Sequence, residues 1–124
     1  MSKIFVFGSN TKGYHGKGAA LAAKQHHGAE SGVGNGRTGN AYAIPTKGRT
    51  LFPLPLDLIQ SYVAEFIDYA NAHPELQFEV TRIGCGYAGY TDGQIAPFFK
   101  GAPSNCNLPL GWRAIAEAAN DSST

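Results

Sequence analysis

The sequence contains little cysteine, little charge and no long apolar segment, and each shortage excludes a class of protein. Its two cysteines, Cys85 and Cys106, are too few for a disulfide scaffold and are not spaced as zinc ligands. We therefore expect reduced thiols, no metal and no cofactor. The apolar run Ile4–Phe7 ends at Gly8, which is too short for a signal peptide or a membrane span. We expect a cytoplasmic protein that does not associate with membranes.

Charge is low and nearly balanced. Ten Lys and Arg residues oppose nine Asp and Glu residues, for a formal net charge of +1. No global field draws such a chain to DNA or membranes, so any anion site must be local. The 43% of hydrophobic residues is typical of a folded protein. A chain of 124 residues fits one domain, which we place at residues 1–119, with residues 120–124 as a frayed C-terminal tail.

The first part of the chain has a strand, a glycine loop and a helix in succession. Ile4–Phe7 is a continuous apolar run, as in a central strand that is buried on both faces. A loop with three spaced glycines follows, and Ala19–His27 is rich in helix formers before Gly28. The stretch Gly28–Gly39 contains five glycines and almost no bulky apolar residue, so we expect a loop that supplies no core.

The second part has a strand, a helix and a further strand that leads into a glycine turn. Tyr42–Thr46 is predicted to be a short strand. Asp57 is a plausible N-cap of an amphipathic helix that ends near His73, because Pro74 disfavours helical geometry before it. Phe78–Ile83 alternates as a strand and leads into a second glycine turn, Gly84–Gly89.

The last part is predicted to contain a short helix, an extended segment and a terminal helical turn. Asp92–Phe99 is expected to form a short helix with Pro97 in its first turns, and Asn105–Leu110 an extended segment. Ala114–Ala119 is expected to be a terminal helical turn. Strands that alternate with helices predict an α/β protein: a mixed, mostly parallel sheet between two helical layers. Ligands of such folds lie beyond the carboxyl ends of the strands, so both glycine turns should share one rim.

Glycine turns at strand ends allow backbone N–H groups to approach a phosphate closely. The first turn is equally compatible with a plain turn, and it has neither the spacing of a Walker loop nor that of a Rossmann fingerprint. Asn10 either contacts a sugar hydroxyl or caps its own turn. Lys47 either reaches the ligand rim or is an ordinary surface lysine.

The remaining candidates also leave two interpretations open. His15 either touches a phosphate or makes a local turn contact. Cys85 fits a small packed residue better than a nucleophile, because no histidine lies near it in the sequence. Tyr87 and Tyr90 either stack on a base or ribose or close the core.

Four segments in order resemble a macro domain. They are Val6–Asn10, His15–Ala20, Tyr42–Lys47 and Thr81–Gly89, within a match from about Ile4 to Phe99. The resemblance is strongest to the branch of ADP-ribosyl glycohydrolases and ADP-ribose-phosphate phosphatases that includes DarG-type antitoxins. It implies a three-layer α/β/α fold with a cleft for ADP-ribose. The implied catalytic residue is Lys47, and the implied ligand-binding residues are Gly8, Ser9, Asn10, His15, Gly16, Lys17, Gly18, Thr46, Gly84, Cys85, Gly86, Tyr87, Ala88, Gly89 and Tyr90.

The chain also departs from that family. The family has an aspartate that binds adenine, and this chain has no counterpart of it before Ile4. Some catalytic relatives carry an acidic residue where this chain has Ala88, although Asp92 is nearby. The departures favour a non-catalytic binder that senses or sequesters a nucleotide signal, as in a phage or bacterial defence context. The presence of Lys47 favours an enzyme that acts on an ADP-ribosylated target or metabolite. A structural domain with a degenerate cleft is a third interpretation, and a homodimer that completes the sheet or cleft is compatible with all three.

Overall fold

The computed structural model describes residues 3–121, with five strands and a set of helices that flank them. In chain order these are β1 Lys3–Asn10, α1 Gly18–His26, β2 Gly36–Thr38, β3 Ala41–Lys47, α2 Leu56–Ala72, β4 Gln77–Val80, α3 Asp92–Ile95, the 3₁₀ helix η1 Ala96–Phe99, β5 Cys106–Asn107 and α4 Trp112–Asp121. None of the helices in residues 3–121 is long and apolar enough to cross a membrane.

The five strands form one mixed sheet in the order β2-β3-β1-β4-β5. The pairs β1–β3, β1–β4 and β4–β5 are parallel, and β2 is antiparallel to β3. The expectation of a mostly parallel sheet is therefore confirmed. Strand β1 is central and pairs on both sides, so it offers no free edge to a second copy of the chain.

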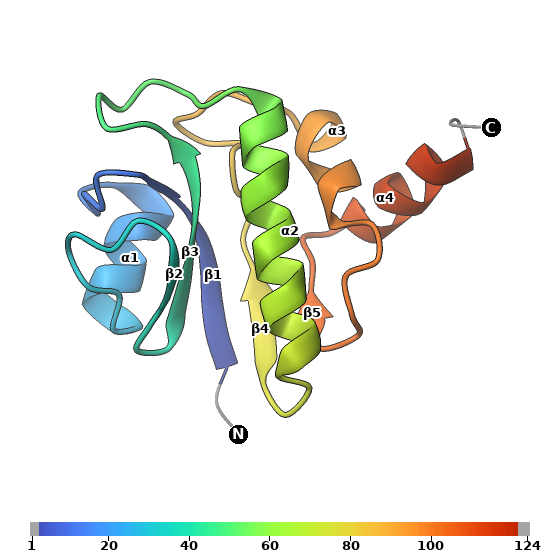
Figure 1. Cartoon of the computed structure of the whole chain (residues 1–124), viewed down its shortest axis with the longest axis horizontal. Coiled ribbons are helices and arrows are strands. Elements are labelled where there is room, and N and C mark those ends of the chain that lie inside the picture. The colour runs from blue at the N-terminus through green and yellow to red at the C-terminus, as the bar shows by residue number, and fades with distance from the viewer. Residues whose placement is uncertain (1–2, 122–124) are drawn as a thin grey trace.

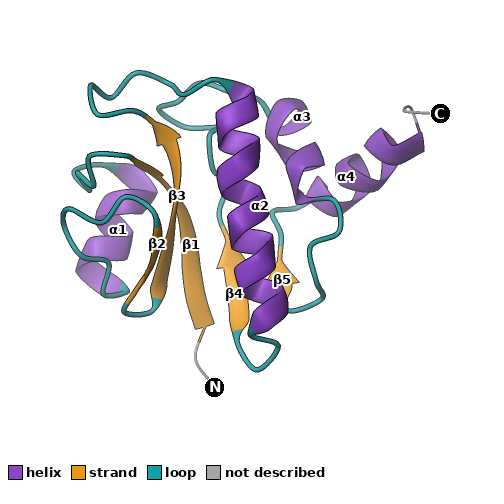
Figure 2. Cartoon of the chain, viewed as in Figure 1, coloured by secondary structure: helices purple, strands orange, loops and turns teal. Residues whose placement is uncertain are grey.

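Helices cover both faces of the sheet (Figures 1 and 2). On one face α2, η1 and α4 pack against Ile4 and Val6, within the larger apolar core. On the other face α1 packs against Phe7 and the small side chains Ala41 and Ala43. Because alternate residues of β1 point to opposite faces, its continuous apolar run is explained by burial on both sides. The structure is a three-layer α/β/α fold.

Helix α2 has the predicted apolar spacing. Ile59, Val63, Phe66 and Ala70 are all buried, at intervals of three and four residues that place them on one helix face. The predicted N-cap at Asp57 is wrong, because the helix begins at Leu56 and its N-cap is Pro55. Asp57 lies in the first turn, where its carboxylate accepts a hydrogen bond from the N–H of Leu58 at 3.0 Å.

The glycine-rich stretch Gly28–Gly39 is more ordered than the sequence suggests. Its end forms β2, and its Ala29 is buried against α1, so the expectation of a loop without core was wrong there. The glycines allow close backbone contact with the first glycine loop. A Cβ on Gly34 would meet the carbonyl oxygen of Asn10 at 2.1 Å, and the N–H of Gly32 donates to Gly13 O at 2.9 Å. This stretch therefore supports the loop that follows β1.

The C-terminal region differs in its boundaries. The predicted strand at Phe78–Ile83 is shorter, because β4 ends at Val80, and the extended segment near Asn105 pairs as β5. The predicted helix at Asp92–Phe99 is α3 followed by η1, with a capping box between Thr91 and Gln94. The predicted turn at Ala114–Ala119 is part of the longer α4. Helix α4 ends at Asp121, and residues 122–124 of the expected tail lie outside the described residues.

Candidate functional site

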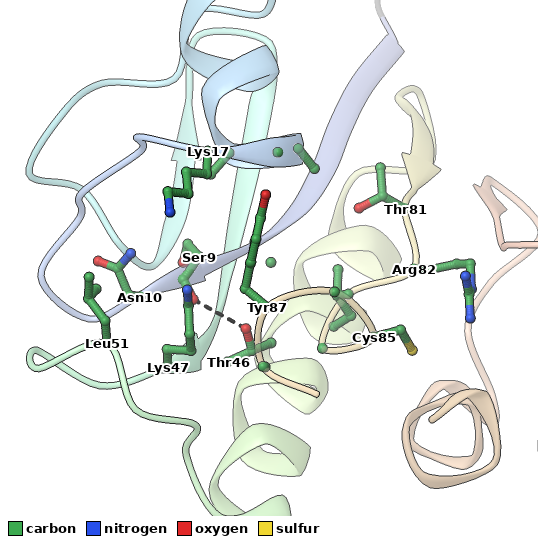
Figure 3. Close-up of a pocket in the computed structure, with 18 of the residues that line it drawn as sticks. Ser9, Asn10, Lys17, Thr46, Lys47, Leu51, Thr81, Arg82, Cys85 and Tyr87 are labelled. Atoms are coloured by element: carbon green, nitrogen blue, oxygen red, sulfur yellow. Dashed lines mark hydrogen bonds between the residues drawn. The ribbon is translucent and has the colours of Figure 1, made fainter. Parts of the chain in front are cut away.

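A cleft of about 430 Å³ lies at the carboxyl ends of β1, β3 and β4. Its walls come from four segments: the end of β1, the first glycine loop with the start of α1, the end of β3, and the segment after β4 (Figure 3). The lining residues are Gly8, Ser9, Asn10, Tyr14, Gly16, Lys17, Gly18, Ala19, Ala20, Thr46, Lys47, Leu51, Thr81, Arg82, Ile83, Gly84, Cys85, Gly86, Tyr87 and Ala88. The structure thus brings both glycine turns to one rim, as the parallel strands predict.

The polar side chains of the cleft floor are bound to the protein itself. The Ser9 hydroxyl donates to the carbonyl of Gly34, and the Thr46 hydroxyl donates to the carbonyl of Ser9 at 3.3 Å. Asn10 donates from Nδ2 to Tyr14 O at 2.8 Å and accepts from the N–H of Tyr14 at 2.9 Å. Asn10 therefore caps its own turn, which was one of the two interpretations of its position.

His15 lies behind the cleft rather than in it. Its side chain is buried, its ring packs edge to face on Phe7 with centroids 5.2 Å apart, and its Nε2 lies 3.1 Å from the carbonyl of Val33. It is not among the residues that line the cleft. His15 therefore connects the first glycine loop to the stretch 28–39. Of the two interpretations of His15, contact with a phosphate or a contact within the protein, the structure shows the second.

Only part of the second glycine turn lines the cleft, and its glycines have different structural roles. Gly84 has a φ of +76°, and a Cβ there would meet Ile95 Cδ1 at 3.0 Å, so the fold itself requires glycine. Gly86 has no such constraint, because its φ is outside the left-handed region and an added Cβ would meet nothing within 4 Å. Gly89 and Tyr90 do not line the cleft, and the Tyr90 hydroxyl donates to Leu54 O at 2.6 Å.

Cys85 lines the cleft as a thiol. Burial raises its pKa, the nearby Asp92 carboxylate raises it further, and its Sγ lies 3.7 Å from Asp92 Oδ1. A thiolate nucleophile requires a lowered pKa, so this environment fits a packed residue. Cys106 is also a free thiol and is buried, and burial raises its pKa to about 11.

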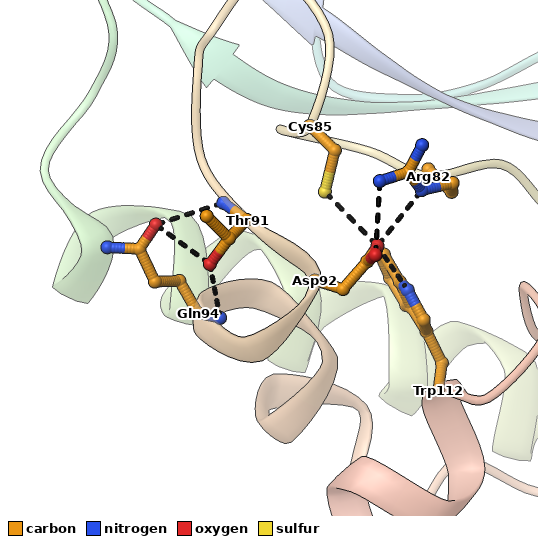
Figure 4. A network of polar contacts seen from close by, with 6 residues as sticks. All are labelled: Arg82, Cys85, Thr91, Asp92, Gln94 and Trp112. Atoms are coloured by element: carbon orange, nitrogen blue, oxygen red, sulfur yellow. Dashed lines mark hydrogen bonds and ion pairs between the residues drawn. The ribbon is translucent and has the colours of Figure 1, made fainter.

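Asp92 is the centre of a polar network outside the cleft (Figure 4). It accepts two hydrogen bonds from Arg82, at 2.9 and 3.1 Å, and one from Trp112 Nε1 at 2.8 Å. The Arg82 side chain, followed by the Trp112 N–H, lowers the pKa of the Asp92 carboxyl. Asp92 does not line the cleft. It holds the second turn against α4 instead, and nothing in the sequence spacing indicated this role.

Lys17 and Lys47 bring positive charge to the cleft from two walls. Both ammonium groups lie over the ring of Tyr87, with Nζ 5.7 and 5.4 Å from its centroid. Arg82, the third lining cation, is held by Asp92. Among residues 3–121, no Asp or Glu lines the cleft. The available charge in the site is therefore positive and comes from the two lysines.

Two lining residues at the mouth were not singled out by sequence reasoning. Tyr14 is 57% exposed and is held by Asn10, and Leu51 adopts a φ of +67°, which is uncommon for a residue other than glycine. The left-handed conformation at Leu51 belongs to a tight turn in which the N–H of Leu51 donates to Gly48 O at 3.0 Å. No local sequence signal predicts a leucine in that conformation.

A metal site has no support in the described part of the chain. Residues 3–121 contain no group of three or more His, Cys, Asp or Glu side chains that could hold an ion.

Comparisons with known proteins identify the fold but no family. No protein-family model matches the chain, and no curated protein matches it. A solved structure described as a protein of unknown function from Bacteroides thetaiotaomicron is similar, with a TM-score of 0.61 and 18% identity over 86% of each chain. The fold and cleft thus define a three-layer α/β protein with a glycine-walled cleft at the carboxyl ends of its strands. At this identity the similarity extends to the fold alone.

Proposed function

We propose that the cleft binds ADP-ribose or a closely related nucleotide diphosphate, as a macro-type domain does. Two glycine turns face each other across the cleft, and its volume of about 430 Å³ is within the range of small-molecule sites. The ligand is either a free nucleotide or the ADP-ribosyl group of a modified target. We place the protein in the cytoplasm, where its two free cysteines remain reduced.

The observation that carries the proposal is the charge of the lining. Lys17 and Lys47 are lining cations without an ion pair in the described residues, and no carboxylate lines the cleft. A cleft with this composition attracts an anion and repels a cation. The backbone of Gly86 is exposed, and the packing of the protein does not require glycine there. The space beside Gly86 allows a phosphate to approach its backbone amide.

A binding function is favoured over hydrolysis by the same lining. A lysine that attacks or polarises an anomeric carbon needs a partner that moves a proton, and no Asp or Glu lines the described cleft. His15 is turned toward Val33 and Phe7 behind it. We therefore infer a protein that senses or sequesters its ligand, and we assign Lys47 to electrostatic binding.

Hydrolysis of an ADP-ribosyl linkage is the second candidate. It is supported by the position of Lys47, which ends β3 inside the cleft and is the only residue of the lining for which the family resemblance implies catalysis. In that case Lys47→Ala abolishes turnover and leaves ligand affinity within a few fold.

Calorimetric titration with ADP-ribose tests the proposal, with NAD and a panel of cyclic nucleotides as competitors for the same cleft. We expect saturable binding of ADP-ribose at a 1:1 ratio. Mass spectrometry of an ADP-ribosylated peptide after incubation with the protein separates the two candidates, because an enzyme releases ADP-ribose from the peptide and a binder leaves the peptide modified. Absence of any heat with ADP-ribose would overturn the proposal.

A further inference from the structure

The two lysines and Tyr87 form an arrangement that no motif in the sequence indicates. Lys17 precedes α1 and Lys47 ends β3, so two side chains that lie 30 positions apart in the sequence meet at one ring. In Figure 3 the two lysine side chains point toward one another from opposite walls, and the Tyr87 ring stands beside them. Convergence of two ammonium groups without an anionic partner is electrostatically unfavourable.

The Tyr87 ring supplies the negative potential that is otherwise missing. The face of an aromatic ring attracts a cation within about 6 Å of its centroid, and both lysines satisfy that distance. Tyr87 is 67% exposed, and its hydroxyl makes no hydrogen bond within the described residues. An incoming anion would replace the contacts of the ring with the two lysines. The ring also lies close to Gly18 at the start of α1, where an added Cβ would meet Tyr87 Cε2 at 3.1 Å.

The turn that carries Tyr87 has few contacts of its own. A Cβ added at Gly86 or Gly89 would meet nothing within 4 Å, and two backbone hydrogen bonds close the turn, from Gly89 N to Gly86 O at 3.0 Å and from Tyr90 N to Gly84 O at 2.8 Å. A side chain on such a turn can rotate away without disturbing the core.

We propose that Lys17 and Lys47 are a two-lysine clamp for one phosphoryl group of the ligand, and that the Tyr87 ring occupies the clamp until the ligand displaces it. This inference rests on the proposed function for the identity of the ligand as a phosphate compound. It adds that side-chain cations grip the phosphoryl group from two walls. It also makes Tyr87 a competitor of the ligand.

The test uses inorganic pyrophosphate, which carries neither base nor ribose, and calorimetry at low ionic strength. Both Lys17→Ala and Lys47→Ala are expected to weaken pyrophosphate binding about 10-fold or more, because each removes a charge-assisted hydrogen bond. Tyr87→Ala is expected to strengthen binding about 2- to 5-fold, since it removes a cation–π competitor. Tyr87→Phe keeps the ring and is expected to match the wild type.

Two matched controls separate the clamp from general effects. Phe52→Ala removes an aromatic side chain that is 74% exposed but does not line the cleft, and Lys100→Ala removes an exposed lysine at the end of η1. Both controls are expected to bind pyrophosphate as the wild type does. Thermal unfolding of each variant establishes that the fold is retained.

Three other outcomes overturn the clamp. Weaker binding by Tyr87→Ala makes the ring a platform for the ligand rather than a competitor. Loss of binding in one lysine variant only leaves a single cation site. Failure of the wild type to bind pyrophosphate removes the clamp, and binding of pyrophosphate in the expected pattern without binding of ADP-ribose keeps the clamp and removes the nucleotide proposal.

Discussion

At the scale of single residues, Gly84 and Gly86 belong to the same turn for different reasons. Gly84 is required by its backbone conformation and by the nearby Ile95 side chain, whereas Gly86 has neither constraint. The packing of the protein therefore explains why residue 84 is glycine but does not explain why residue 86 is glycine. This difference can be measured.

We predict that Gly86→Ala keeps the stability of the wild type and loses about 10-fold or more in ADP-ribose affinity, because its methyl group obstructs the approach of a phosphate to the backbone. Gly84→Ala is predicted to lower the free energy of unfolding by about 1–3 kcal/mol through backbone strain. Urea unfolding and calorimetric titration of both variants check this pair.

Gly93→Ala is the control for that pair. Gly93 lies in α3 outside the cleft, and its nearest neighbour to an added Cβ is Thr91 Oγ1 at 3.9 Å. A loss of stability in Gly86→Ala comparable to that in Gly84→Ala would contradict our interpretation of Gly86.

At the scale of elements, the second turn is attached to α4 through Asp92. Arg82 holds the carboxylate from the segment after β4, and Trp112 holds it from the first residue of α4. Since the pKa of Asp92 is lower in the folded protein, its ionised form stabilises the fold. That contribution is fully present above the unfolded pKa and is lost as the pH falls through the folded pKa.

We predict that Asp92→Asn is less stable than the wild type at neutral pH and that the difference shrinks as the pH falls below about 4. Urea unfolding at a series of pH values measures the difference. Asp68→Asn, which removes an exposed carboxylate on α2 without a hydrogen bond in the described residues, serves as the control. A difference between Asp92→Asn and the wild type that does not depend on pH would assign the effect to lost packing instead.

At the scale of the whole molecule, the larger core ties α2 to the sheet and to η1. Phe66 is fully buried at its centre, and its ring lies 5.1 Å from that of Tyr42, 5.3 Å from that of Phe78 and 6.3 Å from that of Phe99. The Phe66 side chain thus contacts three other elements. Burial in the same core raises the pKa of the Tyr42 hydroxyl to about 12.

We predict that Phe66→Ala lowers the free energy of unfolding by about 3–5 kcal/mol, because it leaves a cavity among these rings. Native domains have about 5–15 kcal/mol of stability, so this is a large share. Phe66→Leu is expected to cost clearly less, and the two denaturation curves give the comparison. An equal cost of both changes would indicate that the site does not depend on filled volume.

Much of the fold follows from local sequence patterns. The apolar run of β1, the helical spacing of α2 and the glycines after two strands each depend on neighbouring residues, so the element types and the shared rim could be predicted. Strand β2 could not be, because Gly36–Thr38 has no apolar pattern and forms only by pairing with β3. The boundaries of α2 and β4 also differed, since ends depend on caps and pairing partners.

The candidate site was only partly predictable for a related reason. By itself, the sequence determined that two glycine turns and a lysine would gather at the carboxyl ends of parallel strands. Only the tertiary structure decided which side chains are free to act there. Asn10 and Thr46 are bound to nearby backbone, Arg82 is bound to Asp92, and Lys17 meets Lys47 at the Tyr87 ring. The physical reason is that strand direction is a property of each segment, whereas the partner of a charge or a hydrogen-bonding group is set by segments far apart in the chain.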